Sequence, residues 1–203
     1  MGDHAYRTVA GAVRAEIVER SSRFLALVAP VGDEAEARAT IDACRSRSPG
    51  ATHHCWAWRL GDGPRERSSD AGEPSGTAGE PMLRVLRGAE IEQVVAVVSR
   101  WFGGVKLGRG GLARTYAAAV ATALGEARVV TLQAVAEIAV AIPYETLGAV
   151  KSALGRQVGR VVQERYGDSA VAWTLRLPRA DLERMTETLK ALGVAPTLAD
   201  RNG

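Results

Sequence analysis

The feature that most constrains the fold is the order of apolar patterns after residue 134. Ile138, Val140 and Ile142 alternate along the chain as in a strand with one buried face, and later segments switch to the helical period. The order βαββαβ is that of a ferredoxin-like domain, which we expect over residues 134–203. Its predicted elements are a strand at 138–142, a helix at 147–154, strands at 158–165 and 171–177, a helix at 182–192 that ends at Gly193, and a strand at 194–198.

The part before this domain, residues 1–130, predicts a separate α+β domain. Its run Val94 to Val98 is continuously apolar, which is typical of a strand buried on both faces. We expect the boundary near 129–133, without a flexible linker, so that the two domains pack together. The predicted elements are strands at 8–20 and 23–28, a helix from 33 to about 48, a strand at 52–60, a long loop at 61–79, a helix from Pro81, the strand at 94–98 and a helix at 112–124.

Composition supports this division and leaves the partner open. A chain of 203 residues suits two domains, and 46% hydrophobic with 24% charged residues is ordinary globular composition. The net charge of +3 is too small to indicate a nucleic-acid partner unless the cations are clustered. No apolar run approaches the roughly 20 residues of a membrane span, and the first residues lack a secretory pattern, so we expect a soluble cytoplasmic protein.

Five glycines occur within nine residues between the buried strand and the helix at 112–124. Glycines let backbone N–H groups converge on one point, and the positive end of a helix dipole adds to their field. No carboxylate occurs between Glu92 and Glu126, so a phosphate would be stabilised here, although a turn built only for close packing explains the glycines equally well. The candidate anion-binding residues are Arg100, Gly103, Gly104, Lys106, Gly108, Arg109, Gly110, Gly111 and Arg114.

The glycine spacing of 103–108 approaches that of a Walker A loop, but Arg109 and Gly110 stand where lysine and a hydroxyl residue would be. Hydrolysis of nucleoside triphosphates in that style is therefore not expected. The cluster of His53, His54 and Cys55 lacks the second cluster that a zinc site needs, so neither a metal nor a cofactor is expected.

A polar segment at 69–79 suggests two functions other than anion binding at the glycine-rich turn. Asp70 and Glu73 could act as a paired acid and base with His53, which would make the chain a hydrolase for peptides or phosphate esters. The other interpretation is a loop that grips a protein partner, as in an adaptor. A nucleophile pair of Cys55 and His53 is disfavoured, because same-face neighbours on a strand lie about 7 Å apart. Two cysteines without CxxC spacing indicate free thiols.

These segments in this order resemble the IMPACT/YigZ family over essentially the whole chain. The family's loop usually has two adjacent acids, whereas here the second position is Ala71, which weakens any mechanism that needs both carboxylates. The matching pieces are Ser22-Arg23-Phe24, Ala51-Thr52-His53 with Cys55, the loop from Asp70 to Gly79, and Arg100-Trp101-Phe102-Gly103-Gly104 with Leu107-Gly108.

The resemblance implies a first domain like domain four of elongation factor G, with the ribosomal protein domain-2-like fold, and a second like its domain five. It also implies a link to translation, since eukaryotic members regulate the kinase of an initiation factor by competing for its activator. Our main expectation is a non-enzymatic regulator that binds RNA or the ribosome through the glycine-rich basic turn. Trp101 and Phe102 could stack on a base, although an aromatic pair after a buried strand is more typical of a core.

Overall fold

The computed structural model describes residues 5–61, 65–155 and 159–199. The chain divides into two compact units. The first comprises residues 6–132, and the second comprises the described residues from Gln133 onward together with Ala5.

The first unit is built on a five-stranded antiparallel sheet with the strand order β2-β3-β6-β4-β5. A separate two-stranded sheet pairs β1 with β7. The strands are β1 (Ala5–Val9), β2 (Val13–Glu19), β3 (Ser22–Pro30), β4 (His53–Leu60), β5 (Arg65–Ser69), β6 (Val94–Trp101) and β7 (Val129–Gln133), and the helices are α1 (Glu34–Arg47), α2 (Gly79–Gly88) and α3 (Gly108–Gly125).

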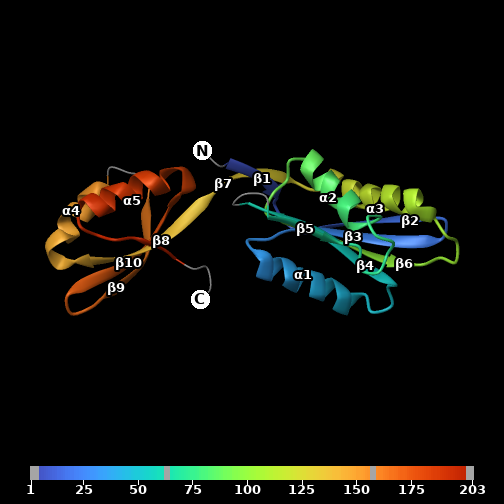
Figure 1. Ribbon diagram of the computed structural model, residues 1–203, viewed down its shortest axis with the longest axis horizontal. Coiled ribbons are helices and arrows are strands. Elements are labelled where there is room, and N and C mark those ends of the chain that lie inside the picture. The colour runs from blue at the N-terminus through green and yellow to red at the C-terminus, as the bar shows by residue number, and fades with distance from the viewer. Residues whose placement is uncertain (1–4, 62–64, 156–158, 200–203) are drawn as a thin grey trace. The chain divides into compact units, whose positions relative to one another are not determined.

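Helices cover both faces of this sheet, with α2 and α3 on one side and α1 on the other (Figure 1). Two apolar cores result. One lies beneath α2 and α3 around Phe24, Met82 and Tyr116, and the other lies beneath α1 around Ile41 and Trp58. The central strand β6 contributes to both cores, as its continuous apolar sequence predicts.

The structure corrects several predicted boundaries in this unit. The predicted strand at 8–20 is two strands that belong to different sheets, β1 and β2. The predicted loop at 61–79 contains β5, an edge strand whose sequence, Arg-Glu-Arg-Ser-Ser, carries no hydrophobic pattern. The segment 129–133, where we expect the domain boundary, forms strand β7, and the division between the two units falls within it. Helix α3 begins at Gly108, so three of the turn's five glycines lie in its first turn.

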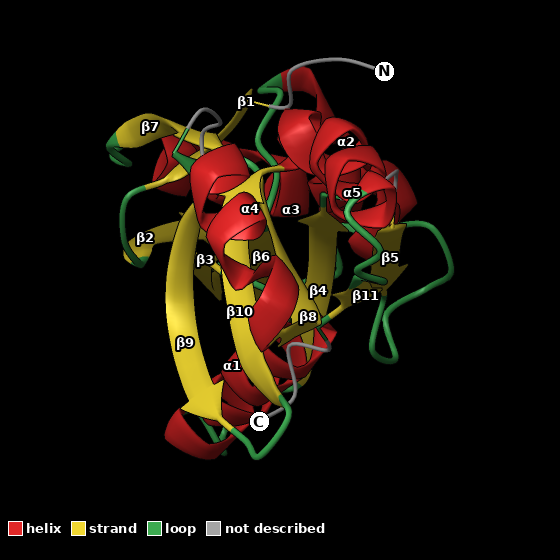
Figure 2. Cartoon of the chain, turned by 90° about the vertical axis from the view of Figure 1, so that its left-hand side faces the viewer, coloured by secondary structure: helices red, strands yellow, loops and turns green. Residues whose placement is uncertain are grey.

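The second unit has the predicted βαββαβ order, and its sheet has the strand order β11-β8-β10-β9. Figure 2 shows these strands side by side, with β9 leftmost. The predicted final strand is short, because Val194 packs in the core and pairing is limited to Thr197 and Leu198. Val158, the predicted start of the third element, lies outside the described residues. The elements are β8 (Val135–Pro143), α4 (Tyr144–Leu154), β9 (Arg160–Tyr166), β10 (Ala170–Pro178), α5 (Leu182–Ala191) and β11 (Thr197–Leu198).

Within the described part of the chain, no helix is long and apolar enough to cross a membrane.

Candidate nucleic-acid interface

The loop that joins β6 to α3 passes tightly over the hairpin between β2 and β3. A Cβ atom placed on Gly103 would lie 2.0 Å from the carbonyl carbon of Ser21, so the backbone of the hairpin occupies the space of any side chain. Gly104 adopts a φ of +87°, which favours glycine. The path of the loop therefore accounts for these two glycines independently of any ligand.

The glycines at the start of α3 leave that end of the helix open. Gly108, Gly110 and Gly111 lie in the first turn, and the N-cap residue Leu107 makes no side-chain hydrogen bond to it. The first N–H groups of a helix have no partner within the helix, and the dipole concentrates partial positive charge there. The 18 residues of α3 thus begin at an uncapped positive end beside two exposed glycines.

Three of the predicted cations surround this end of α3. Lys106, Arg109 and Arg114 are exposed, and none forms an ion pair with a carboxylate within residues 5–61, 65–155 and 159–199. Arg109 donates from Nη2 to the carbonyl oxygen of Ser75 at 2.7 Å, which ties the 70–79 loop to α3. An open pocket of 340 Å³ lies between the hairpin and α3, and its lining includes Ile17, Glu19, Arg20, Leu107, Gly111, Arg114 and Thr115.

Arg100 does not belong to this exposed set, which corrects the sequence-based grouping. Its side chain is only 6% exposed and forms a 2.6 Å ion pair with Glu73. It also donates to Ser22 Oγ at 3.3 Å, whereas its Nε is buried without a hydrogen-bond partner in the described part of the chain. The guanidinium therefore makes its contacts inside the unit, because Arg100 lies on the face of β6 that α2 and α3 cover.

Glu73 anchors the 70–79 loop to that interior. Its carboxylate accepts hydrogen bonds from Arg100 and from the hydroxyl of Tyr116 on α3, the latter at 2.8 Å. Ser22 Oγ, which Arg100 reaches, also accepts the N–H of Gly103 at 3.2 Å. The loop, the start of β3, the end of β6 and helix α3 are thus connected through one buried polar cluster.

Asp70 organises the loop from within. Its carboxylate accepts backbone N–H groups from Gly76 at 2.7 Å, Ala78 at 2.8 Å and Gly79 at 2.9 Å. Burial alone would raise the pKa of Asp70, but these donors and the charge of Arg109 hold the pKa below its usual value. Since α2 begins at Gly79, Asp70 also caps that helix.

His53 and Cys55 lie against the same loop. His53 Nδ1 is 3.0 Å from the carbonyl oxygen of Ala71, and the Cys55 thiol donates to the carbonyl oxygen of Asp70 at 2.9 Å. Burial raises the pKa of the Cys55 thiol to about 12, so the thiolate is scarce near neutral pH. The residues of the hydrolase alternative therefore come together around one loop, but each is held in a contact that shapes that loop.

Sequence reasoning missed the roles of Ser22 and Tyr116. Tyr116 falls in the predicted helix at 112–124 and Ser22 in the family motif Ser22-Arg23-Phe24, but the sequence assigns neither a polar contact. The spacing of a helical face cannot tell which of its members carries a buried hydrogen bond. Among the described residues, no group of three or more His, Cys, Asp or Glu side chains could hold a metal ion.

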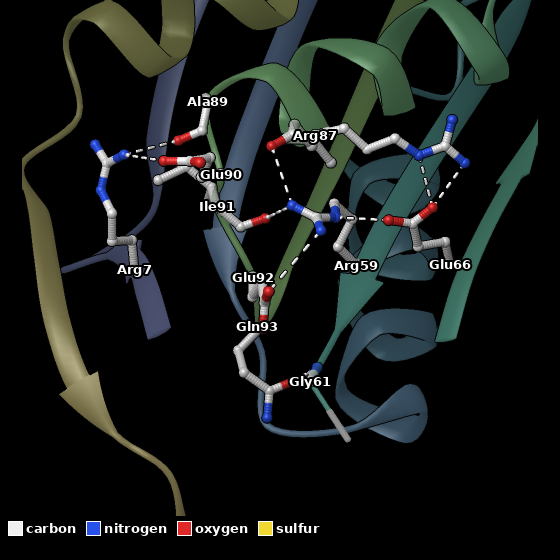
Figure 3. Close-up of polar contacts among 11 residues, drawn as sticks. Arg7, Arg59, Gly61, Glu66, Arg87, Ala89, Glu90, Ile91, Glu92 and Gln93 are labelled. Atoms are coloured by element: carbon white, nitrogen blue, oxygen red, sulfur yellow. Dashed lines mark hydrogen bonds and ion pairs between the residues drawn. The ribbon is translucent and has the colours of Figure 1, made fainter. Parts of the chain in front are cut away.

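The opposite end of β6 is rich in arginines that have partners (Figure 3). Arg59 is 17% exposed, and its guanidinium pairs with Glu66 at 2.7 Å and donates to the carbonyl oxygen of Ile91 at 3.1 Å. Arg87 reaches the same Glu66 at 2.6 Å, and Arg7 donates to the carbonyl oxygen of Ala89. Positive charge at this end is therefore neutralised within the unit.

Comparison with known proteins gives a consistent result over both units. The model of the Impact N-terminal domain matches residues 20–124. An "IMPACT family member in pol 5'region" of Thermus thermophilus is 42% identical over 162 residues, which cover 80% of this chain and 87% of that protein. "IMPACT family member YvyE" of Bacillus subtilis is 39% identical over 74% of this chain and 70% of its own length.

Two further comparisons extend over more of the chain. "IMPACT family member YigZ" of Escherichia coli is 33% identical over 173 residues, which cover 84% of each protein. A solved structure described as that of a hypothetical protein has a TM-score of 0.73 and 29% identity, with 98% of each chain covered.

Proposed function

The chain belongs to the IMPACT family, and from that premise we propose that it is a translation-linked protein that binds RNA, or the RNA of the ribosome, through the start of α3. The surface consists of Lys106, Arg109 and Arg114 with the N–H groups of the first turn. We also propose that the protein acts in the cytoplasm and that its two units resemble domains four and five of elongation factor G.

The observation that carries the proposal is the lack of carboxylate partners for these three cations among the described residues. Arg59 and Arg87 at the opposite end of β6 meet carboxylates, whereas these three cations are exposed without one where α3 presents its positive end. Phosphates are the anions that such a surface suits, since each contact releases a condensed counterion. The interaction would be directed at the backbone and weakly sequence-specific.

The geometry gives less support to the hydrolase alternative. The carboxylate of Asp70 is occupied by three N–H groups, and that of Glu73 is buried between Arg100 and Tyr116. A general base needs a lone pair within reach of a substrate proton. The adaptor alternative keeps one favourable observation, because Pro74, Ser75 and Gly76 are exposed at the tip of a firmly anchored loop.

The test is the salt dependence of RNA binding. Affinity for a short labelled RNA is measured by fluorescence anisotropy over a series of potassium chloride concentrations. In a Lys106→Ala, Arg109→Ala variant, the slope of log affinity against log salt should fall in magnitude by about 1–2, because two phosphate contacts are lost. An unchanged slope in a folded variant would move the binding surface elsewhere.

A matched control removes the same charge at the opposite end of β6. The Arg7→Ala, Arg87→Ala variant also loses two cations, but both are paired with carboxylates in the structure. Its slope should stay close to that of the unaltered protein. A purely global charge effect would instead reduce both slopes equally.

A further inference from the structure

The aromatic pair at the end of β6 is divided by the fold. Trp101 is half-buried on the α1 side of the sheet, where the guanidinium of Arg23 lies 4.1 Å from its ring centroid. Phe102 is 47% exposed, which is unusual for so large an apolar side chain. The expectation that the pair is core therefore fails for Phe102.

Phe102 covers a column of buried groups. The guanidinium carbon of Arg100 lies 5.5 Å from the centroid of the Phe102 ring and 5.3 Å from that of Phe24. Phe24 in turn packs edge-on against Tyr116 at 5.2 Å. The ring of Phe102 thus packs on the guanidinium of Arg100, which the ion pair with Glu73 holds in place. Because the ring is already supported, a ligand that contacts it would cost little side-chain entropy.

The neighbours of Phe102 leave access to it. Gly103 and Gly104 follow without side chains, and Val105 and Lys106 are exposed. An exposed flat ring followed in sequence by exposed cations combines the two elements with which proteins hold single strands, a stacking surface for bases and positive charge for the backbone. An RNA duplex keeps its bases stacked internally and offers mainly backbone and minor groove.

We infer that the surface prefers single-stranded RNA and that Phe102 stacks on an unpaired base. The inference rests on the proposed function for the class of partner, and it adds the strandedness and the residue that determines it. Charge complementarity commits the surface to a polyanion, because the exposed cations that follow Phe102 in sequence, Lys106 and Arg109, have no carboxylate partner in the described part of the chain.

The experiment compares one labelled RNA as a single strand and annealed to its complement, using the full chain. The single strand should bind more tightly, and Phe102→Ala should weaken its binding roughly 5- to 150-fold, the range that removal of one stacking ring produces, while duplex binding changes little. Phe102→Trp should retain the preference and Phe102→Leu should lose it, since only the former keeps a ring. Because Phe102 is exposed, these variants should fold; Tyr166→Ala, which removes an exposed aromatic in the second unit, is the control.

Each outcome decides between the two proposals. Equal binding of the single strand and the duplex, or an unchanged affinity in Phe102→Ala, overturns the stacking inference, and the salt slope of the Lys106, Arg109 variant then judges the proposed function by itself. Equal losses of affinity in Phe102→Leu and Phe102→Trp also overturn stacking. They would show that binding depends on the shape of the side chain and not on the presence of an aromatic ring. Absence of binding to either form overturns both proposals.

Discussion

At the end where β6 begins, arginines are surrounded by acceptors, whereas beyond the other end of β6, at the start of α3, exposed cations have no carboxylate partner among the described residues. Arg59 satisfies carbonyl groups and Glu66 in a half-enclosed site (Figure 3). Lys106 and Arg109 stand beside an uncapped helix with no carboxylate partner in the described ranges. One sheet thus uses the same residue types in two ways, and the presence of a carboxylate partner distinguishes structural charge from charge available to a binding partner.

The ion pair between Arg100 and Glu73 is buried, and breaking it should have the largest effect on the free energy of unfolding. Arg100→Met leaves the carboxylate of Glu73 buried with only Tyr116, which should reduce the free energy of unfolding by about 3–5 kcal/mol. Urea denaturation measures the loss. Adding Glu73→Gln should restore much of the stability, because the uncompensated charge is removed, whereas a loss below about 1 kcal/mol in Arg100→Met would show that the pair is not structural.

The paired end should respond next. Arg59→Ala removes the donor to the carbonyl oxygens of Leu86 and Ile91, while Glu66 keeps its pair with Arg87, so we expect a loss of about 2 kcal/mol. Lys106→Ala at the open end should stay within about 0.5 kcal/mol of the unaltered protein. The comparison of the two ends fails if these two substitutions cost the same in chemical denaturation.

Asp70 should give a smaller effect that depends on pH. Asp70→Asn should cost about 1–2 kcal/mol at neutral pH, because three N–H groups lose a charged acceptor. Since the folded pKa of Asp70 is below its usual value near 4, this stabilisation is present above that value and is lost as pH falls through the folded pKa.

The difference in stability between the Asp70→Asn variant and the unaltered protein should therefore shrink as the pH is lowered from about 4. Denaturant titrations at a series of pH values provide the measurement. A difference that stays constant down to pH 2 would mean that the charge of Asp70 contributes nothing, and that only the shape of the cap matters.

Removing residues 134–203 should have the smallest effect on the difference between the two ends of β6. We propose that these residues form a domain that folds by itself, because they build a core of their own around Ile138, Trp173 and Leu189. The isolated segment should give a well-dispersed amide NMR spectrum. Both ends of β6 should keep their contrast in residues 1–133, and poor dispersion in either piece would show that the division is wrong.

Much of the fold follows from periodicity, and its failures have physical reasons. The alternation of Ile138, Val140 and Ile142 and the apolar run of β6 predict strands that the structure contains. Strand β5 was missed because an edge strand need not carry a hydrophobic pattern. The break between β1 and β2 was missed because both halves have strand-forming residues, and only pairing with β7 separates them.

The candidate site was predictable in composition but not in exposure. The glycines and the lack of nearby acids located the start of α3 from the sequence. Arg100 could not be separated from Lys106 and Arg109 in that way, because its inward direction depends on the register of β6 and on a carboxylate 27 residues earlier in the chain. Ion pairs between distant segments leave no local pattern.

The most direct measurement is the salt slope of RNA binding for the two double variants with equal loss of charge. We expect Lys106→Ala, Arg109→Ala to lower the magnitude of the slope of log affinity against log salt by about 1–2, and Arg7→Ala, Arg87→Ala to leave the slope unchanged. Equal slopes in both variants, or a loss confined to the Arg7, Arg87 variant, would contradict the claim that the open end of β6 is the binding surface.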